Sequence, residues 1–590
     1  MALTSGTWSM VQNISKNSAV CYDAADRRWL LFTRPCEVFT AHDAESIPGL
    51  LNAVEHRVTE GRYYAAGFVA YEAAPAFDAA LAARSPVPFP FIWFGIYERP
   101  ETITFPRATA NGVPDMTWTP SVDDFEYSRS FRSIKEHIHA GDTYQVNYSF
   151  RLRAPFRDDP WTLFVRMIHA QGCGYGAFVN AGRWALLSAS PELFFTRDGD
   201  LLISRPMKGT MPRGLTHAED YRQAERLRHS EKNRAENIMI VDMVRNDMGR
   251  IADRGAVTVT RLFDVEKYLT LWQMTSTVSC RTGAGLTDIF RALFPAASIT
   301  GAPKVRTMQI IRDHEREPRR IYTGTMGFLA PDGRAQFNVA IRTVLVDREK
   351  KTAEYGVGGG LVWDSEKTDE YEECRTKARV LFQPAHEVCL LETMLWTPDK
   401  GYCLLDAHLK RLAESSAYFS HSVDIEAVRK GLFDFSRGLP PHPHAVRLMV
   451  TRNGEPTLEA HRYTPVRRPY RVRLAKRPVD PSNHFLYHKT THRRVYEEAM
   501  AGAKGCDDVL LWNEKGEITE SCIANVIVKI DGRNLTPPVK CGLLPGTYRA
   551  LLIEKGTVTE EPVTVRDLKR CSDICLVNSV RGMWEVLYLE

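Results

Sequence analysis

The chain has 590 residues, too many for a single hydrophobic core, because globular domains usually hold about 100–200 residues. Its hydrophobic content of 44% and charged content of 25% are typical of a globular protein. The net charge of +5 is spread over the whole length without a long Lys/Arg run, so no nucleic-acid partner is expected.

The N-terminus and the hydropathy pattern favour a cytoplasmic protein. The opening residues MALTSGTWSMVQ lack a basic start followed by an apolar core, so we expect no signal peptide. No run of about 20 apolar residues occurs, so we expect no membrane span and no membrane partner. The twelve cysteines contain no C-x-x-C pair and are interpreted as reduced structural thiols.

Residues 1–140 predict strands followed by a helix. Residues 1–120 mix short apolar runs with Pro and Gly, a pattern typical of strands and turns. An amphipathic helix is predicted over residues 123–140, ending at Gly141. The apolar runs that predict strands up to residue 189 are Trp29–Phe32, Gly67–Tyr71, Phe89–Tyr97, Tyr144–Leu152, Gly176–Val179 and Trp184–Ala189.

Two further helices precede a predicted domain boundary. A long charged helix is expected over His217–Asp247, and a second over residues 366–382, stopped by Pro384. A new alternation of apolar and polar residues begins at Val388, so Gln383–Glu387 is the predicted boundary between two domains. A helix over residues 406–419 and a proline-rich segment at 438–444, either a second boundary or a loop, follow. We therefore expect an N-terminal part over residues 1–122, a catalytic domain over 123–383 and a second domain over 388–590.

Carboxylates that share helix faces form the first candidate site. Glu370 and Glu373 are three residues apart and Lys377 follows four residues later, so all three lie on one face of a helix. Glu236 lies on the long predicted helix. Carboxylates presented by two helices can hold Mg²⁺, a cation that prefers oxygen ligands. The spacing alone favours a simpler interpretation, a solvated acidic face with i,i+4 salt bridges.

Three more motifs carry reactive or binding groups. Glu192 in SASPELFF follows a proline among apolar residues, where burial raises a carboxyl pKa and suits a general acid. Lys208 in RPMKGTMPRG precedes Gly209, and a lysine in a dry site can become a nucleophile. The segment YGVGGGLVWDS at 355–365 offers backbone N–H groups to a carboxylate or a phosphate, without P-loop spacing. Taken singly, Glu192 is more often a glutamate at a strand edge than a general acid, and Lys208 is more often a lysine in a surface turn than a nucleophile.

In their order along the chain these segments resemble the chorismate-utilising family, which includes anthranilate, isochorismate, salicylate and aminodeoxychorismate synthases. The resemblance runs from about Phe125 to Phe382, and residues 1–120 fit the family's variable N-terminal part. The matching segments are GDTYQVNYS, SASPELF, RPMKGT, ENIMIVDMVRNDMGR, SITGAPK, YTGTMGF, AIRT, GVGGGLVWDS and DEYEECRTKA.

The resemblance implies a chorismate site that contains Mg²⁺. Glu236 and Glu373 would ligate the ion, which holds the ring carboxylate of chorismate. Glu192 would donate a proton to the departing C4 hydroxyl. The remaining residues to which the resemblance assigns substrate contacts are Gln145, Tyr322, Arg342, Gly358, Gly360, Glu370 and Lys377.

Two positions select the product within this family. Isochorismate and salicylate synthases carry a water-activating Lys where this chain has Gln145, so Gln145 favours ammonia as the nucleophile. Anthranilate synthases carry Ala where this chain has Lys208. The resemblance implies that Lys208 attacks C2, that ammonia adds at C4 and that the lysine is expelled, giving 4-amino-4-deoxychorismate. Trp272 and Gln273 depart from the family pattern, because many relatives carry His there.

The source of ammonia is expected to be another protein. The segment QGCGYG at 171–176 places Cys173 between two glycines, which differs from the G-x-C-x-G nucleophile turn of glutamine amidotransferases. We therefore expect a separate glutamine amidotransferase subunit, or free ammonia.

A second candidate site lies after residue 388. Lys489 lies in LYHKTTHRRVYEEA, and a lysine can bond to the aldehyde of pyridoxal phosphate. Glu520 lies in GEITESCIANVIV, and a carboxylate can pair with the ring nitrogen of that cofactor. CGLLPGTYR at 541–549 predicts a glycine-rich turn before a helix, suited to a phosphate. Without further context, a lysine or a glutamate in such a segment is more often a solvated side chain, and this interpretation applies to both Lys489 and Glu520.

These motifs belong to a set that resembles the class IV pyridoxal-phosphate fold of aminodeoxychorismate lyase, branched-chain aminotransferases and D-amino-acid aminotransferases. The resemblance implies that Lys489 is the catalytic, cofactor-binding lysine, that Glu520 contacts the ring nitrogen, and that Arg411 binds phosphate together with Thr547 and Ser579. Relatives usually have an additional strand and an aspartate–arginine–glycine turn before LLETM. The matching segments are LLETM, LLDAHLKRL, VRLMVTRNG, HKTTHRRVYEEA, ITESCIANV, CGLLPGTYRALL and LVNSVRG.

The expected fold class is α+β, an anthranilate synthase component I-like chorismate-binding domain followed by a class IV aminotransferase-like α/β domain. The expected function is that of a bifunctional enzyme of folate biosynthesis, which makes p-aminobenzoate from chorismate and ammonia with Mg²⁺ and pyridoxal 5'-phosphate. Two alternatives remain: the same synthase fused to a class IV transaminase, or a non-catalytic protein that binds chorismate or a partner.

Overall fold

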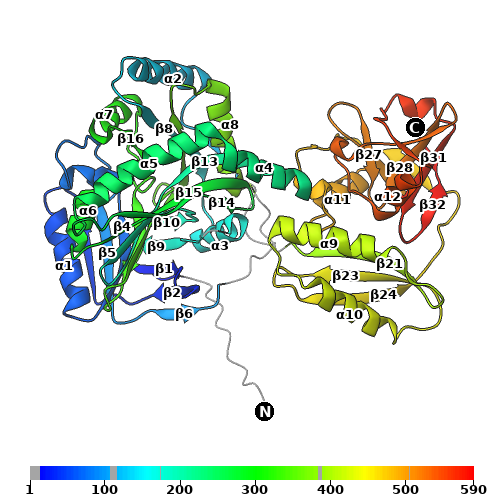
Figure 1. The fold of residues 1–590 in the computed structure, drawn as a ribbon, viewed down its shortest axis with the longest axis horizontal. Coiled ribbons are helices and arrows are strands. Elements are labelled where there is room, and N and C mark those ends of the chain that lie inside the picture. Colours follow the sequence, from blue (N-terminus) through cyan, green and yellow to red (C-terminus); the bar gives the residue numbers. More distant parts are fainter. Residues whose placement is uncertain (1–13, 106–115, 173, 383–387, 504, 590) are drawn as a thin grey trace, which may run out of the picture. The chain divides into compact units, whose positions relative to one another are not determined.

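The computed structural model describes residues 14–105, 116–172, 174–382, 388–503 and 505–589. The chain forms two compact units (Figure 1). The first contains Met1–Pro212 and Gln223–His386, and the second contains Arg213–Arg222 and Glu387–Glu590. The boundary expected at Gln383–Glu387 lies outside the described residues. None of the described helices combines the length and hydropathy needed to cross a bilayer, and every described cysteine is free.

Two ten-stranded antiparallel sheets build the first unit. The strands of sheet A are β1 (Ser18–Asp23), β2 (Arg28–Phe32), β6 (Glu101–Ile103), β7 (Thr119–Pro120), β8 (Gln145–Pro155), β9 (Ala177–Ala181), β10 (Trp184–Ser188), β16 (Gly301–Ala302), β19 (Thr343–Asp347) and β20 (Thr352–Leu361). Their order is β16-β8-β20-β19-β10-β9-β1-β2-β6, with β7 paired to β8.

Sheet B has a similar plan. Its strands are β3 (Glu37–Ala41), β4 (Tyr64–Val69), β5 (Ile92–Tyr97), β11 (Leu193–Asp198), β12 (Leu201–Arg205), β13 (Met207–Pro212), β14 (Thr258–Lys267), β15 (Leu271–Arg281), β17 (Thr325–Leu329) and β18 (Ala335–Val339). Their order is β13-β15-β12-β11-β18-β17-β4-β5-β3, with β14 paired to β15.

Helices cover the outer faces of both sheets. They are α1 (Ile47–Thr59), α2 (Asp124–His139), α3 (Pro160–Gln171), α5 (Glu231–Gly249), α6 (Leu286–Leu293), α7 (Lys304–His314) and α8 (Lys367–Ala378). A further helix, α4 (His217–His229), belongs to the second unit as far as Arg222. Residues of α1, α5 and α6 share one apolar core with sheet B, and residues of α2, α3 and α8 share another with sheet A. A third core lies between the sheets and contains Phe32, Phe68 and Phe328.

The predicted strands and most predicted helices of this unit are confirmed, with two corrections. The single helix expected over His217–Asp247 is wrong, because the extended backbone of Ser230 separates α4 from α5 and its side chain caps α5 by accepting from the N–H of Asn233 (3.3 Å). Strands and turns alone were expected before residue 120, yet α1 lies there. Its buried Leu51, Val54 and Val58 have the helical spacing that identifies it.

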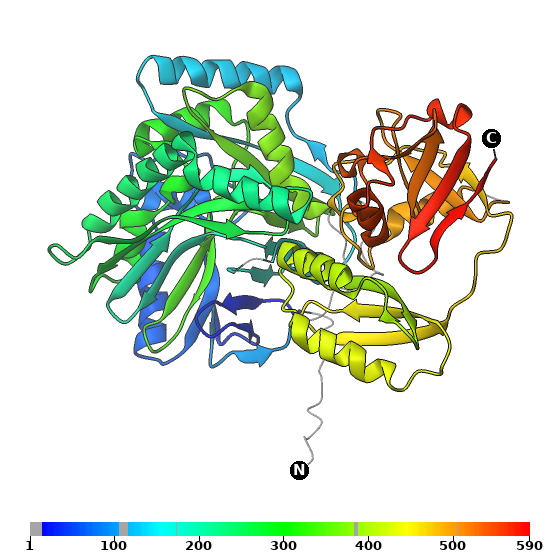
Figure 2. The same cartoon turned by 45° about the vertical axis from the view of Figure 1, so that its right-hand side comes forward.

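The second unit contains two sheets. The strands of its small antiparallel sheet, in the order β22-β21-β23-β24, are β21 (Leu390–Thr397), β22 (Gly401–Tyr402), β23 (His444–Val450) and β24 (Pro456–Arg462). The predicted helix over residues 406–419 is confirmed as α9 (Leu405–Phe419), which shares an apolar core with α10 (Ile425–Ser436) and this sheet (Figure 2). The proline-rich segment at 438–444 is the loop between α10 and β23.

The larger sheet is nine-stranded and mixed in direction. Its strands are β25 (Arg471–Leu474), β26 (Asp508–Trp512), β27 (Ile518–Ser521), β28 (Asn525–Ile530), β29 (Arg533–Thr536), β30 (Thr559–Glu560), β31 (Asp573–Asn578), β32 (Gly582–Glu585) and β33 (Leu587–Tyr588). They run in the order β30-β29-β28-β27-β26-β25-β33, with β31 paired to β28 and β32. The helices α11 (Arg494–Ala501) and α12 (Thr547–Glu554) accompany them.

Candidate active sites

One cavity of the first unit, with a volume of about 230 Å³, brings together charged residues that are far apart in the sequence. Their positions follow from helix–strand packing, since α5 packs on β13 and α8 packs on β20. The predicted site residues that line this cavity are Glu192, Lys208, Glu236, Tyr322, Arg342, Gly358, Gly360, Glu370, Glu373 and Lys377.

Glycines of β20 let other side chains reach the cavity wall. A Cβ on Gly360 would lie 1.9 Å from the Nε2 of Gln145 and 2.5 Å from the Nζ of Lys208, and a Cβ on Gly356 would lie 2.1 Å from the ring of Tyr322. Any larger residue at Gly360 would therefore displace both Gln145 and Lys208.

Gln145 is the one predicted residue of this site that does not line the cavity. It begins β8 and is almost completely buried, with its amide nitrogen against Gly360. Its Oε1 has no hydrogen-bond partner among the described residues. A buried acceptor without a partner is costly, so this oxygen is available to a donor from the ligand.

Burial shifts Lys208 and Glu192 in opposite directions. Desolvation lowers the pKa of Lys208, although Glu236 opposes the change. Desolvation also raises the pKa of Glu192 to about 7, against hydrogen bonds from the Ser298 hydroxyl (2.5 Å) and the Met207 N–H (3.3 Å). Both shifts favour the neutral form of the group, and both groups line the same cavity.

Three carboxylates supply oxygen donors to the cavity. Burial raises the pKa of Glu236 and of Glu370. Although burial also acts on Glu373, the ammonium of Lys377, 2.7 Å away, lowers its pKa. The described residues contain no group of three or more His, Cys, Asp or Glu close enough to enclose a metal ion. An ion here would have to complete its shell with water or a ligand, as Mg²⁺ commonly does.

Several further polar residues line this cavity without having been predicted as site residues. Lys232 stands four residues before Glu236 on α5, and that spacing is a signal that would have located it. Gln273, noted only as a departure from the family pattern, also lies on the wall. The others are Asn147, Thr210, Asn233 and Ser298, for which the sequence carries no local signal.

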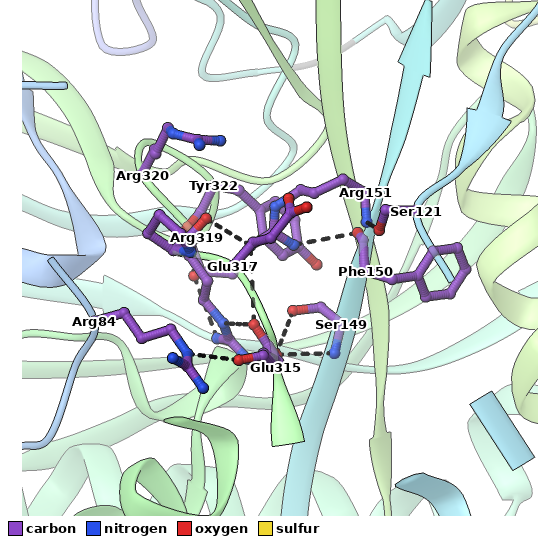
Figure 3. A network of polar contacts seen from close by, with 12 residues as sticks. Arg84, Ser121, Ser149, Phe150, Arg151, Glu315, Glu317, Arg319, Arg320 and Tyr322 are labelled. Carbon is purple, nitrogen blue, oxygen red and sulfur yellow. Dashed lines mark hydrogen bonds and ion pairs between the residues drawn. The ribbon is translucent and has the colours of Figure 1, made fainter. Parts of the chain in front are cut away.

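Next to residues of the cavity wall lies a buried polar network, which Figure 3 shows. Arg319 and Glu315, with side chains 1% and 4% exposed, form a two-point ion pair of 2.6 and 3.0 Å. Arg319 also donates to the carbonyls of Asn147 (2.6 Å) and Ile299 (3.0 Å), which both line the cavity. This ion pair therefore fixes two stretches of the wall in place.

The candidate residues of the second unit lie around Lys489. Burial lowers the pKa of Lys489 to about 8, with Arg411 acting in the same direction. Its Nζ has no hydrogen-bond partner among the described residues. Burial also raises the pKa of Glu520 to about 7, against hydrogen bonds from Tyr496 (2.7 Å) and Asn525 (3.3 Å).

Arg411 and Thr547 meet at the start of α12. Arg411 donates to both oxygens of Glu392 (2.9 and 2.6 Å) and to the carbonyl of Pro545 (3.2 Å), two residues before Thr547. His408 bridges Glu392 (2.6 Å) and the hydroxyl of Thr547 (3.3 Å). Sequence reasoning missed Glu392 and His408, which hold Arg411 and Thr547 in place.

The remaining predicted residue, Ser579, donates to the carbonyl of Thr393 (3.4 Å), beside Glu392 on β21. A Cβ on Gly546, the N-cap of α12, would lie 1.9 Å from the Oδ1 of Asn525. The unpartnered amine, the buried carboxyl and the open helix start suit a cofactor with an aldehyde, a ring nitrogen and a phosphate.

Comparisons with known proteins identify a family for each of two long stretches of the chain. Residues 17–383 match the family model described as chorismate binding enzyme, and residues 389–588 match that described as amino-transferase class IV. Both resemblances and the α+β fold class are thereby confirmed.

Two curated relatives match the first part of the chain. Aminodeoxychorismate synthase component 1 of Klebsiella aerogenes is 40% identical over 300 residues, 49% of this chain and 63% of that protein. Anthranilate synthase component 1 1 of Haloarcula marismortui is 39% identical over 293 residues, 48% of this chain and 60% of that protein. The chain thus spans about three fifths of the length of these relatives.

A solved structure shares the fold of the first unit. Anthranilate synthase component I of Streptococcus pneumoniae TIGR4 superposes with a TM-score of 0.52 at 21% identity, covering 65% of this chain and 95% of that chain. At this identity the likeness concerns the fold alone.

Removing Arg319 is expected to destabilise the first unit. Arg319→Leu leaves the buried Glu315 without its two-point partner and with only the longer ion-pair contact to Arg151 (3.8 Å), which should lower the free energy of unfolding by about 3 kcal/mol. The control is Arg291→Leu, which breaks an exposed ion pair with Asp288 on α6 and should cost about 0.5 kcal/mol or less. Denaturant unfolding of the first unit, followed by tryptophan fluorescence, measures both. Equal costs for the two variants would contradict a supporting role for Arg319.

Proposed function

Because the chain belongs to the chorismate binding enzyme family, we propose that its first unit converts chorismate and ammonia to 4-amino-4-deoxychorismate, and that its second unit releases pyruvate from this product to leave p-aminobenzoate. The observation that carries the proposal is the position of Lys208. Its amine, with a lowered pKa, lines the same cavity as the protonated carboxyl of Glu192.

Lys208 and Glu192 would act together in the first step. The amine of Lys208 bonds to C2 of chorismate while the ring double bonds shift and the C4 hydroxyl leaves. Glu192 gives its proton to that hydroxyl, which departs as water. Ammonia then bonds to C4, the double bonds shift back and the C2–nitrogen bond breaks, which regenerates the Lys208 amine. The surplus proton on the new amino group passes back to Glu192, which restores its protonated carboxyl. The sum is the exchange of one hydroxyl for one amino group with release of water.

The other residues of the cavity would bind and orient chorismate. Arg342 and the backbone at Gly358 and Gly360 suit one carboxylate of the substrate. Glu236 and Glu373 would hold Mg²⁺, with Glu370 beside them, and the ion would supply positive charge for the ring carboxylate. The unpartnered Oε1 of Gln145 would accept a hydrogen bond from ammonia or from the amine of Lys208.

Ammonia would come from a separate subunit that hydrolyses glutamine. The Klebsiella aerogenes relative is a component 1 by name, which supports a division of labour between subunits. The chain would then use ammonium salts in place of glutamine when tested alone.

The second unit would hold pyridoxal phosphate. Lys489 would bond to its aldehyde, Glu520 would pair with its ring nitrogen, and Arg411, Thr547 and Ser579 would surround its phosphate. The bound cofactor would supply an electron sink for breaking bonds next to the substrate nitrogen. Lys489 would carry the proton that has to be moved, since its pKa of about 8 lets it gain and lose a proton near neutral pH.

Lys208→Ala tests the covalent route. We expect formation of 4-amino-4-deoxychorismate to fall by about 10²–10⁴-fold, because the nucleophile is lost, with anthranilate appearing in its place. The products formed from chorismate and ammonium would be separated by liquid chromatography. Lys350→Ala, at an exposed turn of the same unit, is the control and should retain full activity. Unchanged formation of 4-amino-4-deoxychorismate in Lys208→Ala would refute the route.

The pH profile tests Glu192 as the proton donor. Its pKa of about 7 means that the carboxyl is protonated below and ionised above that pH. Therefore kcat/KM for chorismate should fall above about pH 7, towards tenfold per pH unit. The measurement keeps the concentration of un-ionised ammonia constant. Glu192→Gln should be much slower and lose this limb, whereas a parental profile in that variant would assign the proton to another group.

Lys489→Ala separates the two reactions. The parent chain supplied with chorismate, ammonium, Mg²⁺ and pyridoxal phosphate should release p-aminobenzoate and pyruvate in equal amounts. Lys489→Ala should consume chorismate at the parental rate but accumulate 4-amino-4-deoxychorismate, with elimination slowed by about 10²–10⁴-fold. Lys555→Ala, at the exposed end of α12, is the control. An amino group transferred to a keto acid without release of pyruvate would identify a transaminase instead.

A further inference from the structure

One short segment is assigned to the first part of the chain by its sequence match and to the second unit by its packing. Arg213–Arg222 lies inside residues 17–383, which match the chorismate binding enzyme model, yet it packs as part of the second unit. The class IV match begins only at residue 389. The second unit is therefore assembled from two separate stretches of chain.

The segment is internally rigid. Arg213 and Asp220, with side chains 5% and 4% exposed, form a two-point ion pair of 2.6 and 2.8 Å. Asp220 also accepts from the N–H of Gly214 (3.0 Å). A Cβ on Gly214 would lie 2.2 Å from the backbone nitrogen of Asp220, so only glycine fits there.

Tyr418 of α9 holds this rigid turn. The guanidinium of Arg213 lies 4.3 Å from the centre of the Tyr418 ring and donates to the Tyr418 carbonyl (2.7 Å). The Tyr418 hydroxyl donates in return to the carbonyl of Gly214 (2.8 Å). Leu215 packs against the apolar cluster that contains Leu486 and Tyr487.

The contact that matters for chemistry is made by His488, the neighbour of Lys489. Burial lowers the pKa of His488 to about 3, so its ring is neutral. Its Nε2 lies 3.1 Å from the Leu215 carbonyl, which can only accept, so Nε2 carries the proton and donates it. Nδ1 then accepts from the hydroxyl of Ser415 (3.0 Å), and the ring lies against that of Tyr418, 4.2 Å between centres.

We propose that Arg213–Arg222 is a positioning element of the second active site: its Leu215 carbonyl fixes the ring of His488 and thereby sets where the amine of Lys489 points. The claim rests on the proposed function of the second unit, in which Lys489 bonds to pyridoxal phosphate. The geometry that supports it is the clamp on His488, which Ser415 of α9 holds at one nitrogen and Leu215 at the other.

Gly214→Ala in the full chain is the direct test. The added methyl group meets backbone, so the segment must shift and release His488. We expect amide hydrogen exchange over residues 486–490 to become at least about tenfold faster. Titrated with pyridoxal phosphate, the variant should bind at least about fivefold more weakly, and the pH at which the bound cofactor's visible absorbance changes should move. Gly431→Ala, on α10 with open space at its Cβ, is the matched control and should change neither property.

Tyr418→Phe is a second, milder variant. It removes only the hydroxyl that donates to Gly214 and should change the same readouts in the same direction by a smaller factor. Its control is Tyr470→Phe, which removes an exposed hydroxyl. A merely structural role would lower thermal stability without moving the pH of the absorbance change. Exchange, affinity and absorbance within twofold of the parent in both variants would overturn the proposal. A parent chain that binds no pyridoxal phosphate would instead refute the proposed function of the second unit, and hydrogen exchange would still decide whether the segment holds His488.

Discussion

The first unit depends on the removal of charged side chains from water into one cavity. Desolvation penalises any charged form, so it pushes the pKa of Lys208 down and that of Glu192 up. Burial thereby brings the pKa values of the amine and the carboxyl closer together than in water. Glu373 and Lys377 line the same cavity but stand 2.7 Å apart, and their mutual attraction favours the charged form of both. The distance to an opposite charge, rather than the residue type, therefore decides whether burial favours the neutral or the charged form of each group.

In the second unit, too, the neighbours of each buried carboxyl decide whether its pKa rises or falls. Although burial alone would raise the pKa of Glu392, Arg411 and His408 lower it to about 2, so this carboxylate is a fixed charge. Glu520 accepts hydrogen bonds from the neutral side chains of Tyr496 and Asn525, and burial raises its pKa to about 7 although Arg493 and Lys489 oppose the change. A fixed charge suits the anchoring of a phosphate-binding arginine, whereas a carboxyl near its pKa responds to the protonation of a ring nitrogen. The two roles follow from which neighbours each carboxyl has.

The sequence predicted what depends on local pattern or on motif order, and it failed where distant contacts decide. The helix over residues 123–140 has an amphipathic pattern and is capped by Asp123, both of which are visible in the sequence. The break at Ser230 also had a local signal, an N-cap serine, which the charged pattern on both sides concealed. No local pattern could place Ser298 against Glu192 or Arg319 against Asn147, because these contacts depend on how sheets A and B are assembled. The motifs therefore located most of the residues that line the cavity but not the residues that hold them in place.

Arg213–Arg222 shows why a family match is a poor guide to where a unit ends. A family match follows sequence order, whereas a folded unit is defined by which side chains bury each other. Arg213 and Asp220 would be costly as a separate pair, since a buried ion pair needs further partners, and Tyr418 and Gly214 provide them within the second unit. Residues 388–590 alone would lack this turn and would leave the Nε2–H of His488 without its acceptor. Because Lys208 and Arg213 are separated by only five positions on one continuous backbone, the segment that serves Lys489 begins where the strand that carries Lys208 ends. Dividing the chain at the family boundary would therefore remove the residues that hold His488 while leaving Lys489 and Glu520 in place.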